Sequence, residues 1–427
     1  MEKIMQYLWQ WRLYGSPDKR LTDGRALRII DPGRLNTDSG PDFFNAKLEI
    51  DGTLWAGNVE LHLKASDWHR HGHRRDRAYD SVILHVVGVN DSAITRTDGS
   101  AIPQLHLPFD AEIASRYRML SESSRPLRCQ EWLPELSRLH LADWIDSAAM
   151  ERLTAKARRV EETLRYTNGD WSQTTFITIA RALGFGLNGE PFEQLARCVP
   201  VSVAARHSDS LFQLEALLLG QAGLLGDIDR SDTYALSLAD EYSFLAHKYS
   251  LTPLPAHIWK MSRTRPGNSP CRRIALLARL TADMGSLMSR MLDCKGDVDS
   301  LADLFVCRFD GYWSQHYSLS VAAARPAPNA LSADMARTLI LNTAPPLYYA
   351  YGALRGIPEM QEMAQDLLMA LPPERNTVTR FWEQTAGICA ANALESQGLL
   401  QIRRNYCEAR ECLRCRFGHR AIRQSVK

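Results

Sequence analysis

The segment Gly40–Lys64 limits what this chain can fold into more than any other part of the sequence. It contains two strand-like runs joined by Asp51-Gly52, a pair that is typical of the turn of a β-hairpin. Side chains two residues apart share a face of a strand, so Glu60, His62 and Lys64 should point the same way. The sequence thus predicts a hairpin that carries three functional groups on one face.

The register of this hairpin decides whether Asp42 meets Glu60. A two-residue turn at Asp51-Gly52 sets Asp42 opposite Leu61, on the wrong face of the sheet. A three-residue loop over residues 50–52, with Gly52 left-handed, shifts the pairing by one residue and sets Asp42 opposite Glu60. We therefore predict the three-residue loop, with two carboxylates side by side at one edge of the sheet.

The flanking sequence predicts an α/β domain followed by a large all-α domain. A helical apolar stripe in residues 4–13, a short helix after Ser66 and the buried strand Ser81–Val87 surround the hairpin. From Leu136 onward the apolar residues recur at helical spacing. The clearest helical segments are 141–164, 175–183, 211–224, 274–292, 333–342 and 361–371. We expect an α/β domain over residues 1–128, a helical domain over 129–400 and a basic, cysteine-containing tail over 401–427.

Pro41-Asp42, followed by Glu60-Leu61-His62 on an α-β-β-β-α-β order of elements, resembles the signature of the PD-(D/E)XK nuclease superfamily. The resemblance covers about the first quarter of the chain. It implies a restriction-endonuclease-like N-terminal domain and metal-dependent hydrolysis of DNA or RNA, with the helical domain recognising the substrate. His62 stands where the superfamily usually has lysine, and Lys64 lies one step further along the same face. The whole chain also resembles an uncharacterised conserved bacterial family.

The residue types at this edge suit a divalent cation. Mg²⁺ or Mn²⁺ prefers oxygen ligands, which Asp42, Glu60 and the Leu61 carbonyl would supply. The cation lowers the pKa of water and neutralises charge on a phosphate, while His62 or Lys64 would orient the water. The catalytic set expected is therefore Asp42, Glu60, His62 and Lys64. The alternative is that Asp42 caps a strand and the other three form a solvated face.

A polar segment after the hairpin is rich in histidine and arginine. We expect His71, His73, Arg74 and Arg75 to face the phosphates of the substrate. An alternative is that His71 and His73 bind Zn²⁺ together, as paired imidazoles do in metallo-hydrolases. His85, within an apolar run, is interpreted as a core histidine.

Cys407, Cys412 and Cys415 form a second candidate metal site. Three thiolates at this spacing suit Zn²⁺ or an iron–sulfur cluster. His419, Cys389 or the distant Cys129 would supply the fourth ligand. Some nucleases of the PD-(D/E)XK superfamily are closed by a cluster held by one upstream and three C-terminal cysteines, which is a looser resemblance.

Charge and hydropathy bound the partners. A net charge of +2 does not by itself indicate nucleic-acid binding, so that role depends on local basic patches. One such patch is the arginine set Arg263, Arg265, Arg272 and Arg273, in a segment expected to be a polar loop. No apolar run reaches the roughly 20 residues of a membrane span, and nine scattered cysteines fit a reducing cytoplasm. The rival to a nuclease is a non-catalytic nucleic-acid or protein-interaction protein that keeps the nuclease fold.

Overall fold

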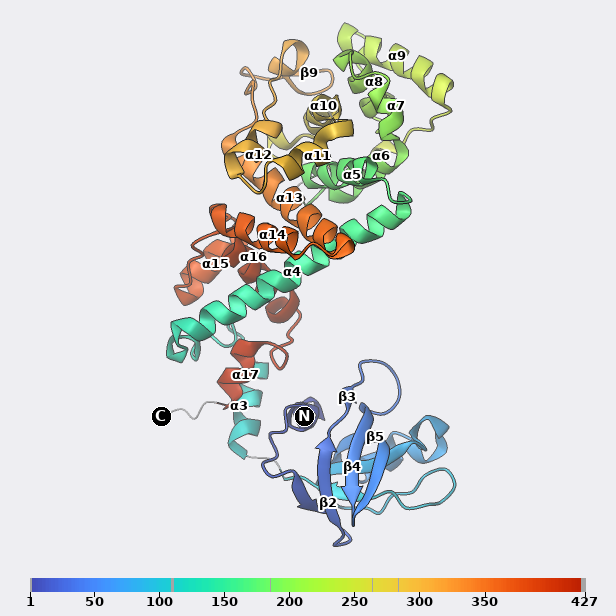
Figure 1. The fold of residues 1–427 in the computed structure, drawn as a ribbon, viewed down its shortest axis with the longest axis vertical. Coiled ribbons are helices and arrows are strands. Elements are labelled where there is room, and N and C mark those ends of the chain that lie inside the picture. Colours follow the sequence, from blue (N-terminus) through green and yellow to red (C-terminus); the bar gives the residue numbers. More distant parts are fainter. Residues whose placement is uncertain (1, 109–110, 185, 263, 283, 424–427) are drawn as a thin grey trace. The chain divides into compact units, whose positions relative to one another are not determined.

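The computed structural model describes residues 2–108, 111–184, 186–262, 264–282 and 284–423 (Figure 1). The chain divides into two compact units: unit 1 comprises Met1–Ser137 and Arg404–Lys427, and unit 2 comprises Arg138–Arg403. Unit 2 is thus inserted into the chain of unit 1. The sequence-based boundaries were 128/129 and 400/401, and the structure groups the C-terminal tail with the sheet-containing unit.

Unit 1 is built on a seven-stranded mixed sheet of order β1-β2-β4-β5-β6-β7, with β3 paired to β4. The strands are β1 (Asp18–Arg20), β2 (Ala26–Asp31), β3 (Arg34–Leu35), β4 (Phe43–Ile50), β5 (Thr53–Lys64), β6 (Val82–Val89) and β7 (Gln104–His106). The strands from β1 to β5 pair antiparallel, whereas β6 runs parallel to both β5 and β7. A parallel pair needs a crossover, and α2 (Asp67–Arg70) with two 3₁₀ turns makes it.

The hairpin between β4 and β5 brings Asp42 to Glu60 by a different route from the one predicted. Ile50 pairs with Thr53, so the turn has two residues, and both Asp51 (φ 46°) and Gly52 (φ 79°) are left-handed. The predicted three-residue loop is therefore wrong. The pairing shifts by one residue between Phe43 and Ala46 instead, where Asn45 has φ 57°. This β-bulge turns the two-residue register into the one that places Asp42 beside Glu60.

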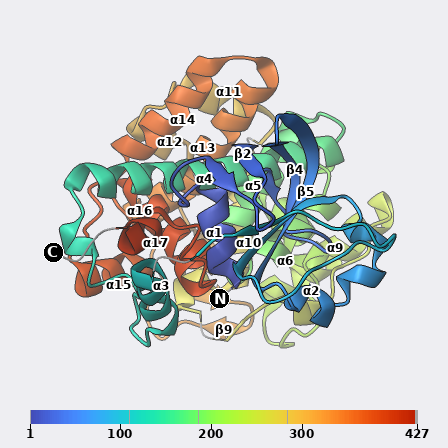
Figure 2. The ribbon, with the colours of Figure 1, turned by 90° about the horizontal axis from the view of Figure 1, so that it is seen from below.

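Helix α1 (Glu2–Gln10) packs against β3 and β5 and closes the core of the sheet (Figure 2). Its Met5 and Trp9 are fully buried with Phe43, Val59 and Leu84. Strand β6 is buried along nearly its whole length, as its continuous apolar sequence predicts. Elsewhere in unit 1, α3 (Ala111–Glu122) lies beside α17 (Arg416–Arg423).

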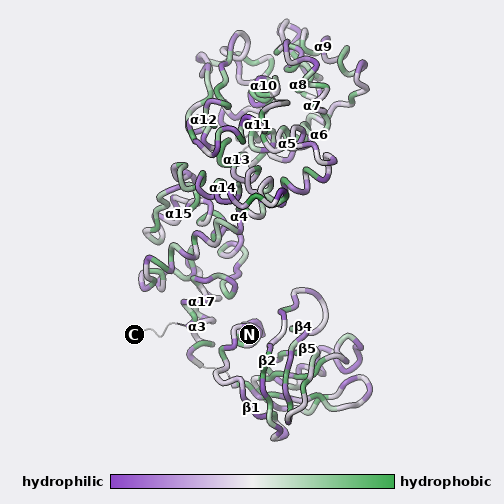
Figure 3. Tube along the Cα trace, viewed as in Figure 1, coloured by the Kyte–Doolittle hydropathy of each residue, from purple (hydrophilic) through white to green (hydrophobic). Residues whose placement is uncertain are grey.

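Unit 2 is helical, in agreement with the sequence. Its helices are α4 (Arg138–Tyr166), α5 (Trp171–Leu183), α6 (Gly189–Cys198), α7 (Val201–Ala205), α8 (Leu211–Gln221), α9 (Thr233–Tyr249), α10 (Pro270–Thr281), α11 (Met284–Asp293), α12 (Val298–Leu304), α13 (Ala333–Arg355), α14 (Pro358–Ala370), α15 (Thr377–Ala386) and α16 (Ala393–Gln401). Hydrophobic and hydrophilic residues alternate along the long helices, and the hydrophobic ones share one large core (Figure 3). A small hairpin, β8 (His316–Ser318) and β9 (Val321–Ala322), is its only sheet among the described residues. None of the described helices is long and apolar enough to cross a bilayer.

Two of the four arginines expected in a polar loop of unit 2 lie in a buried helix instead. Arg272 and Arg273 lie inside α10 and are 4% and 3% exposed. The Arg272 guanidinium donates to the backbone carbonyls of Trp313, His316 and Pro328, so it ties α10 to the segment after it. The Arg273 guanidinium donates to Asn268 Oδ1. Both arginines are buried and hydrogen-bonded within unit 2, so neither is available as a phosphate contact.

Of the other two arginines in that set, Arg265 is exposed. Arg263 lies outside the described residues.

We predict that Asn45→Val lowers the stability of unit 1 by about 1–2 kcal/mol, because a β-branched residue resists the left-handed backbone of the bulge. Asn45→Gly should retain wild-type stability, since glycine adopts this conformation freely. Asn45 is exposed, so neither change removes core packing. Thermal unfolding of both variants provides the measurement, and equal stability of Asn45→Val and wild type would contradict the role given to the bulge.

Candidate functional site

Asp42 and Glu60 are held together by reciprocal bonds between the start of β4 and the middle of β5. The Asp42 backbone N–H donates to Glu60 Oε2 (2.9 Å), and the Leu61 N–H donates to Asp42 Oδ2 (2.9 Å). Gln6 of α1 donates from Nε2 to Asp42 Oδ1 (2.6 Å). The two carboxylates predicted to meet are thus neighbours on one face of the sheet, and one oxygen of Glu60 remains directed elsewhere.

Burial keeps both carboxyl groups from ionising easily. Desolvation, together with the charge of Glu60, raises the pKa of Asp42 to about 7. Desolvation likewise raises the pKa of Glu60 to about 8, against the lowering effect of the Asp42 N–H. Near neutral pH the pair therefore retains protons unless a cation replaces them.

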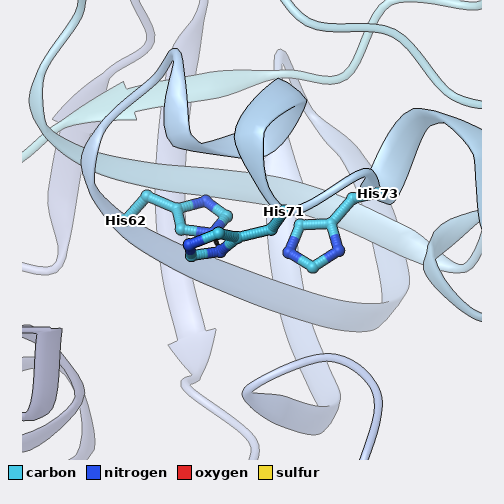
Figure 4. A group of neighbouring side chains, drawn as sticks. All are labelled: His62, His71 and His73. Carbon is cyan, nitrogen blue, oxygen red and sulfur yellow. Dashed lines mark hydrogen bonds between the residues drawn. The ribbon is translucent and has the colours of Figure 1, made fainter.

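Three histidines lie together beside the remaining oxygen of Glu60. His62 comes from β5, His71 directly follows α2, and His73 begins a 3₁₀ turn, and one ring nitrogen of each lies within 4.8 Å of the others (Figure 4). Glu60 Oε1 is 3.6 Å from His62 Nε2 and 3.4 Å from His73 Nε2. His62 Nε2 is 3.1 Å from His71 Nδ1. The three imidazoles therefore form one group, and Glu60 Oε1 borders it on the side of His62 and His73.

The ring of His62 is oriented by His85 of the adjacent strand. His62 Nδ1 lies 2.7 Å from His85 Nε2, in a buried hydrogen bond that leaves His62 Nε2 facing His71 and Glu60. Desolvation, then the neighbouring histidines, lowers the pKa of His62 to about 2. Desolvation also lowers the pKa of His85 to about 3, so both rings are neutral. The 3.6 Å contact of His62 with Glu60 is consequently no ion pair.

His73 is held by aromatic side chains. Its ring stacks on Tyr79 with centroids 3.7 Å apart, and Trp68 lies at its edge. Its Nε2 is buried and makes no hydrogen bond. Desolvation lowers the pKa of His73. A neutral nitrogen with an unused lone pair is thus aimed at Glu60, which is the state required of a metal ligand.

The other predicted site residues lie at the margin. Arg74 and Arg75 are exposed directly after His73, whereas His73 itself is buried and not available to a substrate surface. Lys64 is exposed at the end of β5, near Asp91, whose pKa it lowers less than the hydrogen bonds from Ser66 do.

Two residues of the site were not predicted from the sequence. Gln6 could be assigned to the site only once α1 was known to pack on β5. His85 lies opposite Glu60 because strands β5 and β6 pair in parallel, a register that the sequence did not reveal.

The cysteines gather in another part of unit 1. Cys129, Cys407, Cys412 and Cys415 all line one pocket. His419 lies apart from that lining, with its ring against Tyr7 (5.3 Å) and Trp11 (5.0 Å) of the N-terminal segment.

Cys389, the remaining candidate for the fourth ligand, is exposed and belongs to unit 2. Among the alternatives for the fourth ligand, the structure brings Cys129 to the three tail cysteines.

Comparison with protein-family models gives one match, over residues 2–377. The chain belongs to the family DUF2851. Its description is "Protein of unknown function", which agrees with the resemblance of the whole chain to an uncharacterised family and names no activity. Searches of the curated proteins and of the solved structures gave no significant match to this DUF2851 chain. The matched range includes the carboxylates, the histidine cluster and Cys129.

We predict that unit 1 of the metal-free protein loses stability as pH rises from 7.5 to 8.5. In this window native Glu60, and Asp42 in part, retain protons that the unfolded chain has lost. Unfolded histidines have already lost most of their protons at this pH, so the neutral rings of His62 and His85 contribute little to the slope. The loss should approach roughly 1.4 kcal/mol per pH unit for each retained proton. Unfolding midpoints in EDTA should show this slope, and Asp42→Asn combined with Glu60→Gln should flatten it.

The matched control is Asp38→Asn, an exposed acid in the loop before β4, which should keep the wild-type slope. A wild-type midpoint that stays level or rises over this range would contradict the raised pKa values.

Proposed function

We propose that this protein is a metal-dependent phosphodiesterase acting on nucleic acid, with its centre at Glu60, Asp42 and the histidines His62, His71 and His73. The observation that carries the proposal is that Nε2 of His62 and Nε2 of His73 lie 3.6 and 3.4 Å from one oxygen of the buried Glu60 carboxylate. His71 completes a group of three histidines, and Asp42 provides a second carboxylate beside Glu60. Buried groups of this kind are costly without a cation or protons to neutralise them.

The topology of unit 1 supports the nuclease reading over other metal hydrolases. Apart from the short strands β1 and β3, the order is a helix (α1), three antiparallel strands (β2, β4 and β5), a crossover helix (α2) and a parallel strand (β6). Asp42 stands at the start of the second of these strands and Glu60 within the third, as in the PD-(D/E)XK arrangement that the sequence resembles. The departure is His62, which is neutral and therefore cannot replace the cationic lysine of that signature.

The donor set suggests a borderline metal rather than Mg²⁺. Imidazole nitrogens suit Mn²⁺, Zn²⁺ and other transition metals, whereas Mg²⁺ prefers oxygen alone. His62 fits such a ligand because His85 occupies its Nδ1 and fixes the ring, as outer hydrogen bonds do around metal-bound histidine. His73 fits because its Nε2 is buried with no hydrogen bond. His62 stands at the position of the signature lysine, but it would act as a metal ligand and not as a cation.

The residues of the chain would divide the work as follows. A cation held here would supply Lewis-acid chemistry, by lowering the pKa of water and neutralising phosphate charge. Asp42 Oδ1 and Oδ2, fixed by Gln6 and Leu61, would accept a proton from the attacking water. Trp68 and Tyr79 restrict water on the side of His73, which strengthens the electrostatics of the site.

The substrate class follows from the surface beside the ligands. Four arginines of the crossover, all exposed, flank His71 and His73: Arg70, Arg74, Arg75 and Arg77. Guanidinium groups pair well with phosphate oxygens, and a row of them fits a polyanionic backbone. Their position between β5 and β6 places positive charge next to the cation site without involving the buried arginines of α10.

We predict that wild type cleaves a mixed panel of single- and double-stranded DNA and RNA when Mn²⁺ is supplied. Asp42→Asn and Glu60→Gln should lower the rate at least about 100-fold, because the first removes the acceptor of the water proton and the second removes a ligand of the cation. Asp38→Asn should cleave at the wild-type rate. Gel analysis of labelled oligonucleotides gives the measurement.

The rival is a nucleic-acid-binding protein that keeps the fold without catalysis. Salt-dependent binding of the same oligonucleotides, with no cleavage under any metal, would favour the rival and overturn the proposed reaction. Cleavage that survives Asp42→Asn would show that the activity belongs to another site or to a contaminant.

Metal binding gives a second prediction that does not depend on finding the substrate. His62→Ala, His73→Ala and Glu60→Gln should each weaken Mn²⁺ binding at least about tenfold, and His85→Ala should weaken it about 10–100-fold through the ring of His62. His69→Ala, an exposed histidine in the same crossover, should bind as wild type. Isothermal titration with Mn²⁺ is suitable because cysteine thiolates prefer softer metals. Equal affinity in all variants would remove the histidine site.

A further inference from the structure

The four cysteines of unit 1 flank, in the sequence, the segment that forms unit 2. Cys129 lies shortly before unit 2 begins at Arg138, and Cys407, Cys412 and Cys415 follow its end at Arg403. All four line the same pocket, although 278 positions of sequence separate Cys129 from the nearest of the others. Sequence proximity therefore does not account for their meeting.

The local backbone brings the tail cysteines together. The Cys415 N–H donates to the Cys412 carbonyl (3.3 Å), which closes the turn of a Cys-x-x-Cys pair, and the Arg410 N–H donates to the Cys407 carbonyl (3.2 Å). Gly418 of α17 allows the loop to approach closely, because a Cβ there would lie 2.1 Å from the Cys412 carbonyl oxygen. Tight turns of this kind present two sulfur atoms to one metal.

The surroundings of the four sulfurs suit a thiolate-bound metal. Cys129 and Cys415 are buried, 7% and 5% exposed. Four thiolates around a doubly charged centre leave a net negative charge. Arg128, which lines the pocket and hydrogen-bonds to the Cys412 sulfur, supplies a compensating cation.

We propose that Cys129, Cys407, Cys412 and Cys415 hold a metal centre, either Zn²⁺ or an iron–sulfur cluster. The centre would join the two segments of unit 1 that precede and follow unit 2 in the sequence. The site is separate from Glu60 and the histidines and does not depend on the proposed hydrolysis. Such a centre stabilises the folded tail directly, since its ligands are not assembled in the unfolded chain.

The test is metal analysis of the full-length protein purified without oxygen and without chelators. Wild type should contain about one zinc per chain, or several irons with matching sulfide and a visible charge-transfer absorption. Cys129→Ser and Cys412→Ser should each lower that content at least tenfold. Cys198→Ser and Cys389→Ser, which change exposed cysteines, should leave it unchanged. Asp42→Asn should also leave it unchanged, which separates this site from the hydrolytic one.

Two further measurements keep the proposal testable if a cysteine variant fails to fold. Titration of wild type with an organomercurial should release the metal in step with the thiols that react, and circular dichroism should report whether each variant is folded. Wild type without stoichiometric metal, even after anaerobic reconstitution with Zn²⁺ or with iron and sulfide, would overturn the proposal. A folded Cys129→Ser protein with full metal content would do the same.

Discussion

Two backbone N–H groups and two carboxylates exchange hydrogen bonds where β4 begins beside β5. The Asp42 N–H donates to Glu60 and the Leu61 N–H donates to Asp42. Neither carboxylate can therefore turn away without leaving a buried N–H donor unsatisfied. This exchange fixes Glu60 Oε1 toward the histidines. His62 is positioned by β5, and His73 is positioned by the crossover. Both lie close to Glu60 Oε1 only because that oxygen is held in place.

The same arrangement buries several ionisable groups next to one another inside unit 1. Desolvation pushes the carboxyl groups toward their protonated forms and the imidazoles toward their neutral forms. A cation bound here would favour the ionised carboxylates, so its binding would release the protons that they retain. Structural ion pairs elsewhere in the molecule are different: Glu215 in unit 2 is buried, but Arg279, Tyr234 and Trp313 satisfy both of its oxygens.

Residue pattern alone was enough for the hairpin, the buried strand β6, the helical unit and the meeting of Asp42 with Glu60. The strand register that brings them together could not be predicted, because a bulge at exposed Asn45 depends on backbone conformation and leaves no periodic pattern in the sequence. Arg272 and Arg273 were misplaced because their neighbours are polar, although the helix around them is buried. Cys129 stood among several possible partners for the tail cysteines, since spacing cannot choose between residues that only the tertiary fold brings close.

The discontinuous course of unit 1 has a consequence for how the protein is made. A ribosome completes the whole helical unit, Arg138–Arg403, before Cys407, Cys412 and Cys415 emerge. Until then Arg116 of α3 lacks the Ile422 carbonyl to which it donates in the finished protein (3.1 Å). The sheet-containing unit therefore matures last, although most of it is translated first. A nascent chain would present α3 without its partner α17 for most of its synthesis, the period in which chaperones have access to it.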